Sequence, residues 1–98
     1  MKAGYLGVYP QDVSKEEREK RGISEKEGLL LRNVSPDGPA DKAGLKAKDI
    51  ILTMQGNAVT TKNLRSILQR FGSGKTLNCV VLRDTEKITI DLMLGERP

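Results

Sequence analysis

The chain has 98 residues, 37% of them hydrophobic, which suits one small domain with a single core and leaves no room for a second. It contains no histidine, which excludes Ser-His-Asp and Cys-His catalysis and histidine-ligated metal sites. The net charge is +4, but acids are interleaved with the bases and only one Phe and two Tyr could stack on nucleobases, so we predict a solvated surface without nucleic-acid binding.

The first predicted strand covers residues 5–9, Tyr-Leu-Gly-Val-Tyr, and is bounded by Pro10. A glycine inside a strand marks either a bulge or a close approach of another backbone. From the residues alone, we favour an ordinary edge strand with a bulge at Gly7.

A short surface helix is predicted between Ser14 and Gly22. Ser14 is its expected N-cap, Glu17 completes a capping box three residues later, and Gly22 ends the helix. Because this segment has almost no apolar face, Val13 and Ile23 are its expected ties to the core.

The most regular stretch of the sequence is VSPDGPADKAGLKAKDIILTMQGN, residues 34–57. A strand over 29–34 is predicted to enter a type I turn at Ser-Pro-Asp-Gly, residues 35–38. Proline at the first helical position and glycine at the C-cap then predict a one-turn helix from Pro39 to Gly44. After a polar bend, the apolar run at 50–52 is predicted to be a buried strand that ends at Gly-Asn.

The second half begins with a very short predicted strand at 57–59, followed by a helix that Thr60 or Thr61 can cap and that runs to Phe71. Its apolar residues recur at the spacing of one helical face: Leu64, Ile67, Leu68 and Phe71. We expect the first and last in the core, whereas Leu68, alone or together with Ile67, lies at the edge of the stripe where a groove can open.

Two β-rich runs, 76–83 and 87–94, are predicted to form a hairpin through 84–86, with alternating buried and wet positions in the second run. The lone cysteine, Cys79, lies in the first run, which favours a small buried residue over a reactive thiol. Motifs for phosphate, dinucleotide or zinc binding are absent, so no cofactor, metal ion or catalytic residue is predicted. No apolar run is long enough to span a membrane, so membrane insertion of this domain is not expected.

The order of strand, SPDGPA turn, one-turn helix, AGL, polar bend, DIIL and GN resembles the centre of a PDZ domain of the bacterial, circularly permuted type. It is most similar to the PDZ domains of the HtrA, or Deg-type, serine proteases, over almost the whole chain. Lys48 stands where that family commonly has Gly, and Met54-Gln55 stand where Val-Asn or a similar pair is usual.

The resemblance implies an α+β fold: a partly open β-barrel of five or six strands with one main capping helix over 61–71 and one or two short helices. It implies a peptide-binding groove between that helix and strand 5–9. Tyr-Leu-Gly-Val then corresponds to the family's carboxylate-binding loop, in which successive amides point at the C-terminal carboxylate of a bound peptide: Tyr5, Leu6, Gly7 and Val8. The groove would add four residues of the helix: Thr61, Arg65, Ile67 and Leu68.

The implied function is recognition of exposed apolar C-termini of unfolded or partner proteins by strand addition. We expect residues 1–98 to be a single domain excised from a larger envelope or periplasmic protein, with a serine protease as the parent and no catalysis by this chain. The alternatives are another envelope protein, such as an intramembrane metalloprotease, a C-terminal processing protease or a secretion component, and a non-catalytic assembly scaffold. Homo-oligomeric assembly of the parent remains open.

Overall fold

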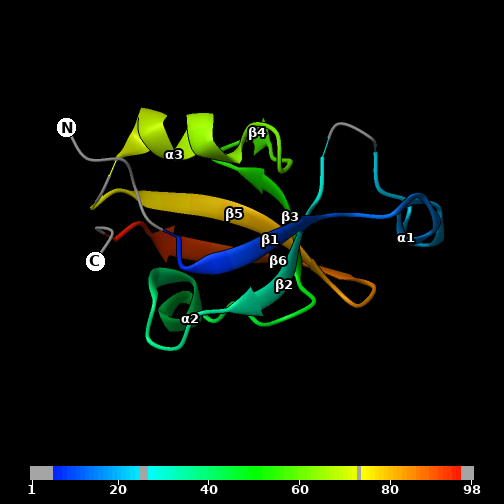
Figure 1. Cartoon of the computed structure of the whole chain (residues 1–98), viewed down its shortest axis with the longest axis horizontal. Helices are drawn as coiled ribbons and strands as arrows, with labels where there is room; N and C mark the ends of the chain where they lie inside the picture. Colours follow the sequence, from blue (N-terminus) through cyan, green and yellow to red (C-terminus); the bar gives the residue numbers. More distant parts are fainter. Residues whose placement is uncertain (1–5, 25–26, 73, 96–98) are drawn as a thin grey trace.

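The structure is a computed structural model that describes residues 6–24, 27–72 and 74–95. Within these residues, six strands and three helices follow one another along the chain (Figure 1). Their order is β1 (Val8–Asp12), α1 (Lys15–Arg21), β2 (Leu29–Val34), α2 (Pro39–Ala43), β3 (Ile50–Met54), β4 (Asn57–Ala58), α3 (Leu64–Phe71), β5 (Thr76–Arg83) and β6 (Glu86–Met93).

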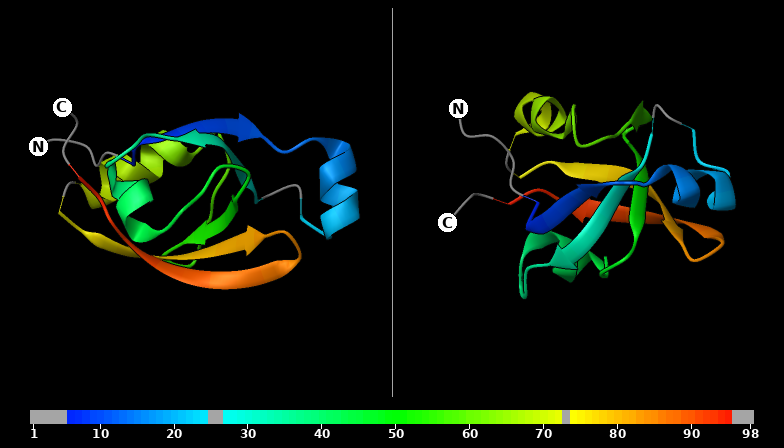
Figure 2. Two further views of the ribbon diagram at one scale, coloured as in Figure 1. Left: turned by 90° about the horizontal axis from the view of Figure 1, so that it is seen from below. Right: turned by 45° about the vertical axis from the view of Figure 1, so that its right-hand side comes forward.

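The strands form one antiparallel sheet in the order β1-β2-β3-β5-β6, and the short β4 pairs with β3. The longest ladder joins β5 to β6, from Thr76 opposite Met93 to Arg83 opposite Glu86. The sheet is strongly curved, so that β1 and β2 lie across the molecule from β5 and β6 (Figure 2, left). This confirms the predicted α+β fold with a partly open barrel, one main helix and two short ones.

Buried apolar side chains form two clusters rather than the single core expected from the length, because β3 is buried on both faces. Ile51 of β3 points into the main core, while its neighbours Ile50 and Leu52 point into a smaller one, as expected for side chains that alternate along a strand. The smaller core contains Val13 and Ile23, the predicted ties of α1. The buried members of the main core are Leu6, Leu29, Leu31, Ala40, Leu45, Ile51, Met54, Val59, Ile67, Leu77, Cys79, Val81, Leu92 and Leu94.

The first strand differs from its prediction. Strand β1 begins at Val8 and continues through Pro10 to Asp12, whereas we expected it over 5–9; Tyr5 lies outside the described residues. Gly7 has a φ of 74° and precedes the strand, because this left-handed conformation does not continue a β-ladder. Proline is tolerated inside β1 because this is an edge strand.

The turn at 35–38 is not of type I. Asp37, its third residue, has a φ of 62°, a sign that type II turns have at this position. The Asp37 N–H donates to the Asp41 carboxylate at 2.9 Å, which helps to hold this conformation. Proline at the start of α2 and a left-handed Gly44 at its end are both as predicted.

Helix α3 begins at Leu64, three residues later than expected, because the threonines before it belong to a turn. Asn63 is the N-cap residue, but its side chain makes no cap hydrogen bond. Its amide instead accepts the Thr60 N–H and donates to the Ala58 carbonyl, both at 2.8 Å. The helix still ends at Phe71, as predicted.

The predicted capping box of α1 is half formed among the described residues. The Glu17 N–H donates to the Ser14 hydroxyl at 3.2 Å, and Gly22 closes the helix in a left-handed conformation. The Glu17 carboxylate pairs with Arg21 Nε at 2.8 Å, one turn further along the helix. At the other end of the sheet, Glu86 belongs to β6 rather than to the hairpin turn.

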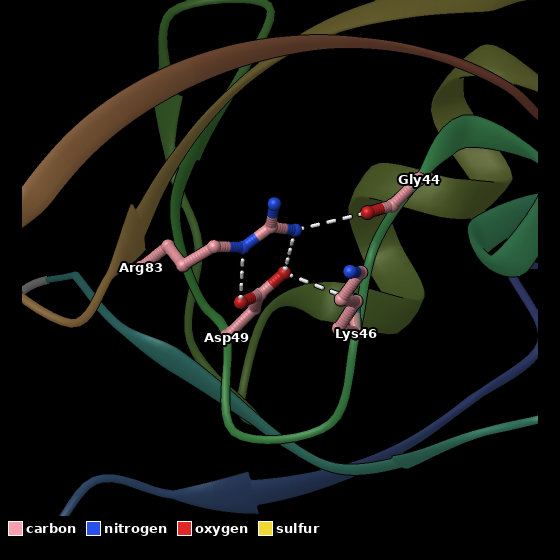
Figure 3. Close-up of polar contacts among 4 residues, drawn as sticks. All are labelled: Gly44, Lys46, Asp49 and Arg83. Carbon is pink, nitrogen blue, oxygen red and sulfur yellow. Dashed lines mark hydrogen bonds and ion pairs between the residues drawn. The ribbon is translucent and has the colours of Figure 1, made fainter.

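A buried ion pair joins β5 to the loop between α2 and β3 (Figure 3). Asp49 is 2% exposed and is the one buried polar or charged residue of the described chain. Its two carboxylate oxygens accept Arg83 Nε at 3.0 Å and Arg83 Nη2 at 2.7 Å, and one of them also accepts the Lys46 N–H at 2.9 Å. Arg83 Nη2 donates in addition to the Gly44 carbonyl, which fixes the end of α2 as well.

Candidate functional site

Strand β1 has one free edge. It pairs with β2 on one side, and no other described strand pairs with it. An edge strand presents main-chain N–H and C=O groups that can pair with another chain. A ligand strand could pair only with those residues of β1 that direct their main-chain groups to the free edge.

The hydrogen bonds of β2 and of the residue after it show which residues of β1 face the free edge. The Ser35 N–H donates to the Gly7 carbonyl at 2.9 Å, which makes the neighbouring pair Val8 and Val34 a non-hydrogen-bonded pair of the antiparallel ladder. In such a pair the N–H and C=O groups point away from the partner strand. Val8 therefore directs both groups to the free edge of β1.

Pro10 also faces the free edge. It lies opposite Leu31, whose N–H donates to the Asp49 carbonyl at 2.8 Å and whose C=O accepts the Lys48 N–H at 2.7 Å. Because Leu31 uses both main-chain groups on the side of β3, it makes no bond to Pro10. The irregularity between Tyr9 and Pro10 places the extra residue on β2, so alternation along β1 is preserved and also directs Pro10 outward.

The segment before β1 contains two amides, those of Leu6 and Gly7, for which the described part of the chain provides no acceptor. The carbonyls of Leu6 and Gly7 accept the N–H groups of Ala40 and Ser35, at 3.0 and 2.9 Å. Their own N–H groups meet no acceptor among the described residues, although Leu6 is only 3% exposed and Gly7 is buried. Buried amides without partners are rare. Consecutive free N–H groups at a left-handed glycine are a suitable site for an anion.

The apolar residues predicted for the groove differ in their exposure. Val8 and Leu68 are partly exposed and pack against the main core from β1 and α3. Leu6 and Ile67 are buried in that core, at 3% and 6% exposure, so they support the site from beneath. Of the described apolar side chains predicted for the groove, those of Val8 and Leu68 are therefore the two that a ligand can contact.

The polar residues predicted on the helix side are placed differently. Arg65 is exposed on α3. Thr61 lies in the turn before α3, and its hydroxyl donates to the Asp12 carboxylate at the end of β1. This bond ties the segment before α3 to β1. No local sequence pattern predicts it, because the two residues are 49 positions apart.

The charge of this region suits an anionic ligand. No Asp or Glu occurs from Ile50 to Arg83, and α3 carries the exposed residues Arg65 and Arg70. The described residues contain no group of three or more His, Cys, Asp or Glu placed to hold a metal ion. None of the helices in the described part of the chain is long and apolar enough to cross a bilayer.

Comparisons with known proteins identify the family of this chain. The family model described as "PDZ domain" matches residues 4–94. The chain belongs to the PDZ domain family. The proteins that this PDZ domain resembles include serine endoproteases named DegP-like and DegS, and the HtrA-type protease AlgW.

Two curated relatives and two solved structures illustrate the similarity. The "Probable periplasmic serine endoprotease DegP-like" of Marinomonas sp. (strain MWYL1) is 38% identical over 95 residues, 96% of this chain and 20% of the relative. The serine endoprotease DegS of Escherichia coli (strain K12) is 27% identical over 96 residues, 97% of this chain and 27% of the relative.

The HtrA-type protease AlgW has been solved with a decapeptide and with a tripeptide, and both structures are 31% identical to this PDZ domain. Each covers 98% of this chain, with TM-scores of 0.81 and 0.84, over 30% and 32% of the AlgW chain. This PDZ domain thus spans between a fifth and a third of the length of these relatives.

Proposed function

We propose that this PDZ domain binds exposed apolar C-termini of unfolded or partner proteins by strand addition to β1. The observation that supports this most is the order of main-chain groups from Leu6 to Val8: two amides without an acceptor among the described residues, followed by a residue whose N–H and C=O face a free edge. A C-terminal carboxylate has the charge and the acceptors to satisfy the amides. An extended peptide has the donors and acceptors to pair with Val8.

The ligand would run antiparallel to β1, with its carboxylate at Leu6 and Gly7. Its last residue would pair with Val8 and place its side chain against Val8 and Leu68, the partly exposed apolar residues of β1 and α3. Main-chain bonds would supply affinity for any extended tail, whereas the apolar contact would select the terminal residue. Arg65 and Thr61 would meet the ligand further upstream.

In this proposal, the domain recognises substrates or regulates proteolysis within an HtrA-type serine protease of the periplasm. The support is that its relatives carry the names of periplasmic serine endoproteases. Binding requires no catalytic group in this chain, which has no histidine. Peptide bond cleavage would belong to a separate domain of the parent protein.

The test compares a fluorescent peptide that ends in a free carboxylate on Leu with its C-terminal amide, by anisotropy at fixed ionic strength. Hydrogen bonds to a charged group contribute about 1.5 to 3 kcal/mol, so amidation should weaken binding about 10-fold to 100-fold. A third peptide, the amide with a compensating upstream Glu, controls for general attraction to the +4 domain. Equal affinity for all three would contradict carboxylate recognition.

Two matched variants of α3 locate the site in the same assay. Leu68→Ala should weaken binding by about 1 to 3 kcal/mol through lost apolar contact, whereas Arg65→Ala should cost about 0 to 1 kcal/mol because its side chain is exposed. Folding of both variants is checked by circular dichroism. Binding by a folded Leu68→Ala variant at wild-type strength would show that the ligand does not lie against α3.

A further inference from the structure

Pro10 lies where an added strand would need a donor. Residues of β1 that face the free edge recur every second position, so Pro10 follows Val8 in the row of groups open to a ligand. Proline has no N–H. The free edge therefore offers a donor and an acceptor at Val8, but only an acceptor at Pro10.

The geometry of an antiparallel ladder identifies the ligand group that is affected. Partners of outward-facing residues are also two positions apart. If the last residue of the ligand pairs with Val8, the third residue from its end pairs with Pro10. The N–H of that ligand residue can donate to the Pro10 carbonyl, whereas its own carbonyl finds no donor on β1.

The next outward residue, Asp12, is the last residue of β1. It lies opposite Leu29 at the end of the ladder with β2, and its side-chain carboxylate accepts the hydroxyl of Thr61 from the segment before α3. Its main-chain N–H and C=O face the free edge by the same alternation. Pro10 is thus the outward residue of β1 that lacks a donor, and it separates Val8 from the single outward residue at the end of the strand.

We propose that Pro10 ends the main-chain ladder and makes this PDZ domain a reader of short C-terminal tails, recognised by the carboxylate and the last residue. This inference rests on the function proposed above. Residues upstream of the third from the end would add little affinity, because the rung at the third residue is half missing and β1 has only one outward residue, Asp12, beyond it. The class of ligand is therefore a tail whose terminal apolar residue is exposed, whatever sequence precedes it.

Proline on an edge strand also discourages pairing between folded proteins. That role needs only a missing donor somewhere on the edge, and it predicts nothing about ligand length. The two roles differ in one measurable respect. If Pro10 limits the ladder with the ligand, a residue with an N–H at this position should gain a bond to one specified ligand carbonyl.

The experiment is a cycle of two protein forms and two ligands, measured by isothermal titration calorimetry. The ligands are an acetylated octapeptide ending in Thr-Ala-Leu and the same peptide with an ester in place of the Thr-Ala amide. The ester weakens the carbonyl of the third residue from the end as an acceptor, and it removes an N–H that points away from β1. The protein forms are the wild type and Pro10→Ala, with Pro10→Val as a second variant that favours the strand.

Wild type should bind the amide and ester octapeptides equally, within about 2-fold. Pro10→Ala should bind the amide octapeptide about 2-fold to 10-fold more tightly, as expected for one added hydrogen bond, and should lose this gain with the ester. The acetylated tripeptide Thr-Ala-Leu should bind wild type within about 3-fold of the octapeptide, since few upstream bonds form. The matched control is Gln11→Ala, because Gln11 pairs with Leu30 and directs its main chain toward β2. This variant should bind both octapeptides with wild-type affinity.

Two outcomes would overturn the inference. Wild-type binding that weakens several-fold with the ester would show that the carbonyl already has a donor. A folded Pro10→Ala variant without an ester-sensitive gain would show that the ladder does not reach this position. Either result leaves carboxylate recognition standing if the free-acid octapeptide still binds better than its C-terminal amide, so the two proposals fail separately.

Discussion

Cys79 combines a chemically reactive group with an environment that suppresses its reactivity. It is completely buried in β5, and burial raises the pKa of its thiol from 9.0 to about 12, with a further contribution from the charge of Asp91. The thiolate is the nucleophilic form of cysteine. The interpretation of Cys79 as a core residue is therefore confirmed by its position in the main cluster.

The raised pKa makes stability depend on alkaline pH. The unfolded chain loses the Cys79 proton near pH 9, whereas the folded chain keeps it until about pH 12. The contribution of this group to the free energy of unfolding is therefore fully present below pH 9 and is lost as the pH rises from 9 to about 12. One pH unit above 9 the free energy of unfolding should be lower by about 1.4 kcal/mol. Urea unfolding at pH 8 and pH 10 measures this. The Cys79→Ala variant should lack the extra decrease, and an identical decrease in both proteins would contradict the assignment.

Among the elements, β5 and the loop before β3 are joined by the Asp49–Arg83 pair (Figure 3). The loop also contains Lys48, a residue with a side chain in the left-handed region at a φ of 75°. A left-handed side chain costs about 1 to 2 kcal/mol relative to glycine. The Lys48 N–H donates to the Leu31 carbonyl, so the loop that carries this strain also determines which way β2 directs its main chain.

Arg83→Met should destabilise the domain by about 2 to 3 kcal/mol, because it leaves the Asp49 carboxylate buried without a counter-ion. The expected loss is smaller than for a fully buried pair, since a third of the Arg83 side chain (34%) is exposed. Urea denaturation of the single variants and of Asp49→Ala/Arg83→Met gives the coupling. If the losses in free energy of unfolding of the two single variants sum to that of the double variant, the pair contributes nothing to stability. The pair Glu17–Arg21, one turn apart on α1, is the control: its carboxylate is 39% exposed, whereas that of Asp49 is buried, so Arg21→Met should cost less than about 1 kcal/mol.

Elements defined by local chemistry were predicted closely. Strands β2 and β5 have their predicted bounds, and the glycines Gly22 and Gly44 end their helices in left-handed conformations as expected. The start of α3 was wrong, because two threonines that suit an N-cap are used in a turn held by Asn63. Asn63 can form this turn because β4 places the Ala58 carbonyl within reach of its side chain. The local sequence pattern does not reveal that position.

The candidate site was only partly accessible from sequence. Leu6, Gly7 and Val8 were found through the family resemblance, whereas the outward direction of Pro10 follows from bonds that Leu31 makes to the loop before β3. Proline was interpreted as the end of the first strand because its usual effect is to interrupt a ladder. On a free edge it interrupts nothing in the folded domain, so the strand continues through it.

The two cores differ in size and in the elements that they hold together. The main core packs the sheet against α2 and α3, and it includes the residues beneath the proposed site. The smaller core lies on the opposite face of β3, and among the described residues Val13 and Ile23 connect it to the α1 segment. In Figure 1, α1 projects at the end of the molecule away from α2 and α3.

Helix α1 should therefore open without the rest of the domain. It has no buried residue, and its links to the following segment are Arg18 Nη1, which donates to the carbonyls of Ser24 and Glu27, and the Ile23 N–H, which donates to the Arg18 carbonyl. Segments with few buried apolar contacts open with much smaller free energies than core strands. Native-state hydrogen exchange followed by NMR should show α1 amides at least about 100-fold less protected than those in the middle of β5.

The Ile23→Ala variant tests whether this independence has the proposed cause. Removing the buried side chain should lower the protection of α1 amides further, and it should leave peptide affinity unchanged, since Ile23 lies in the smaller core and Leu6, Val8 and Leu68 pack on the main one. Exchange of α1 amides in step with those of β5 would contradict the prediction. That result would mean that the smaller core couples α1 to the whole sheet, and that ligand binding at β1 would also protect α1.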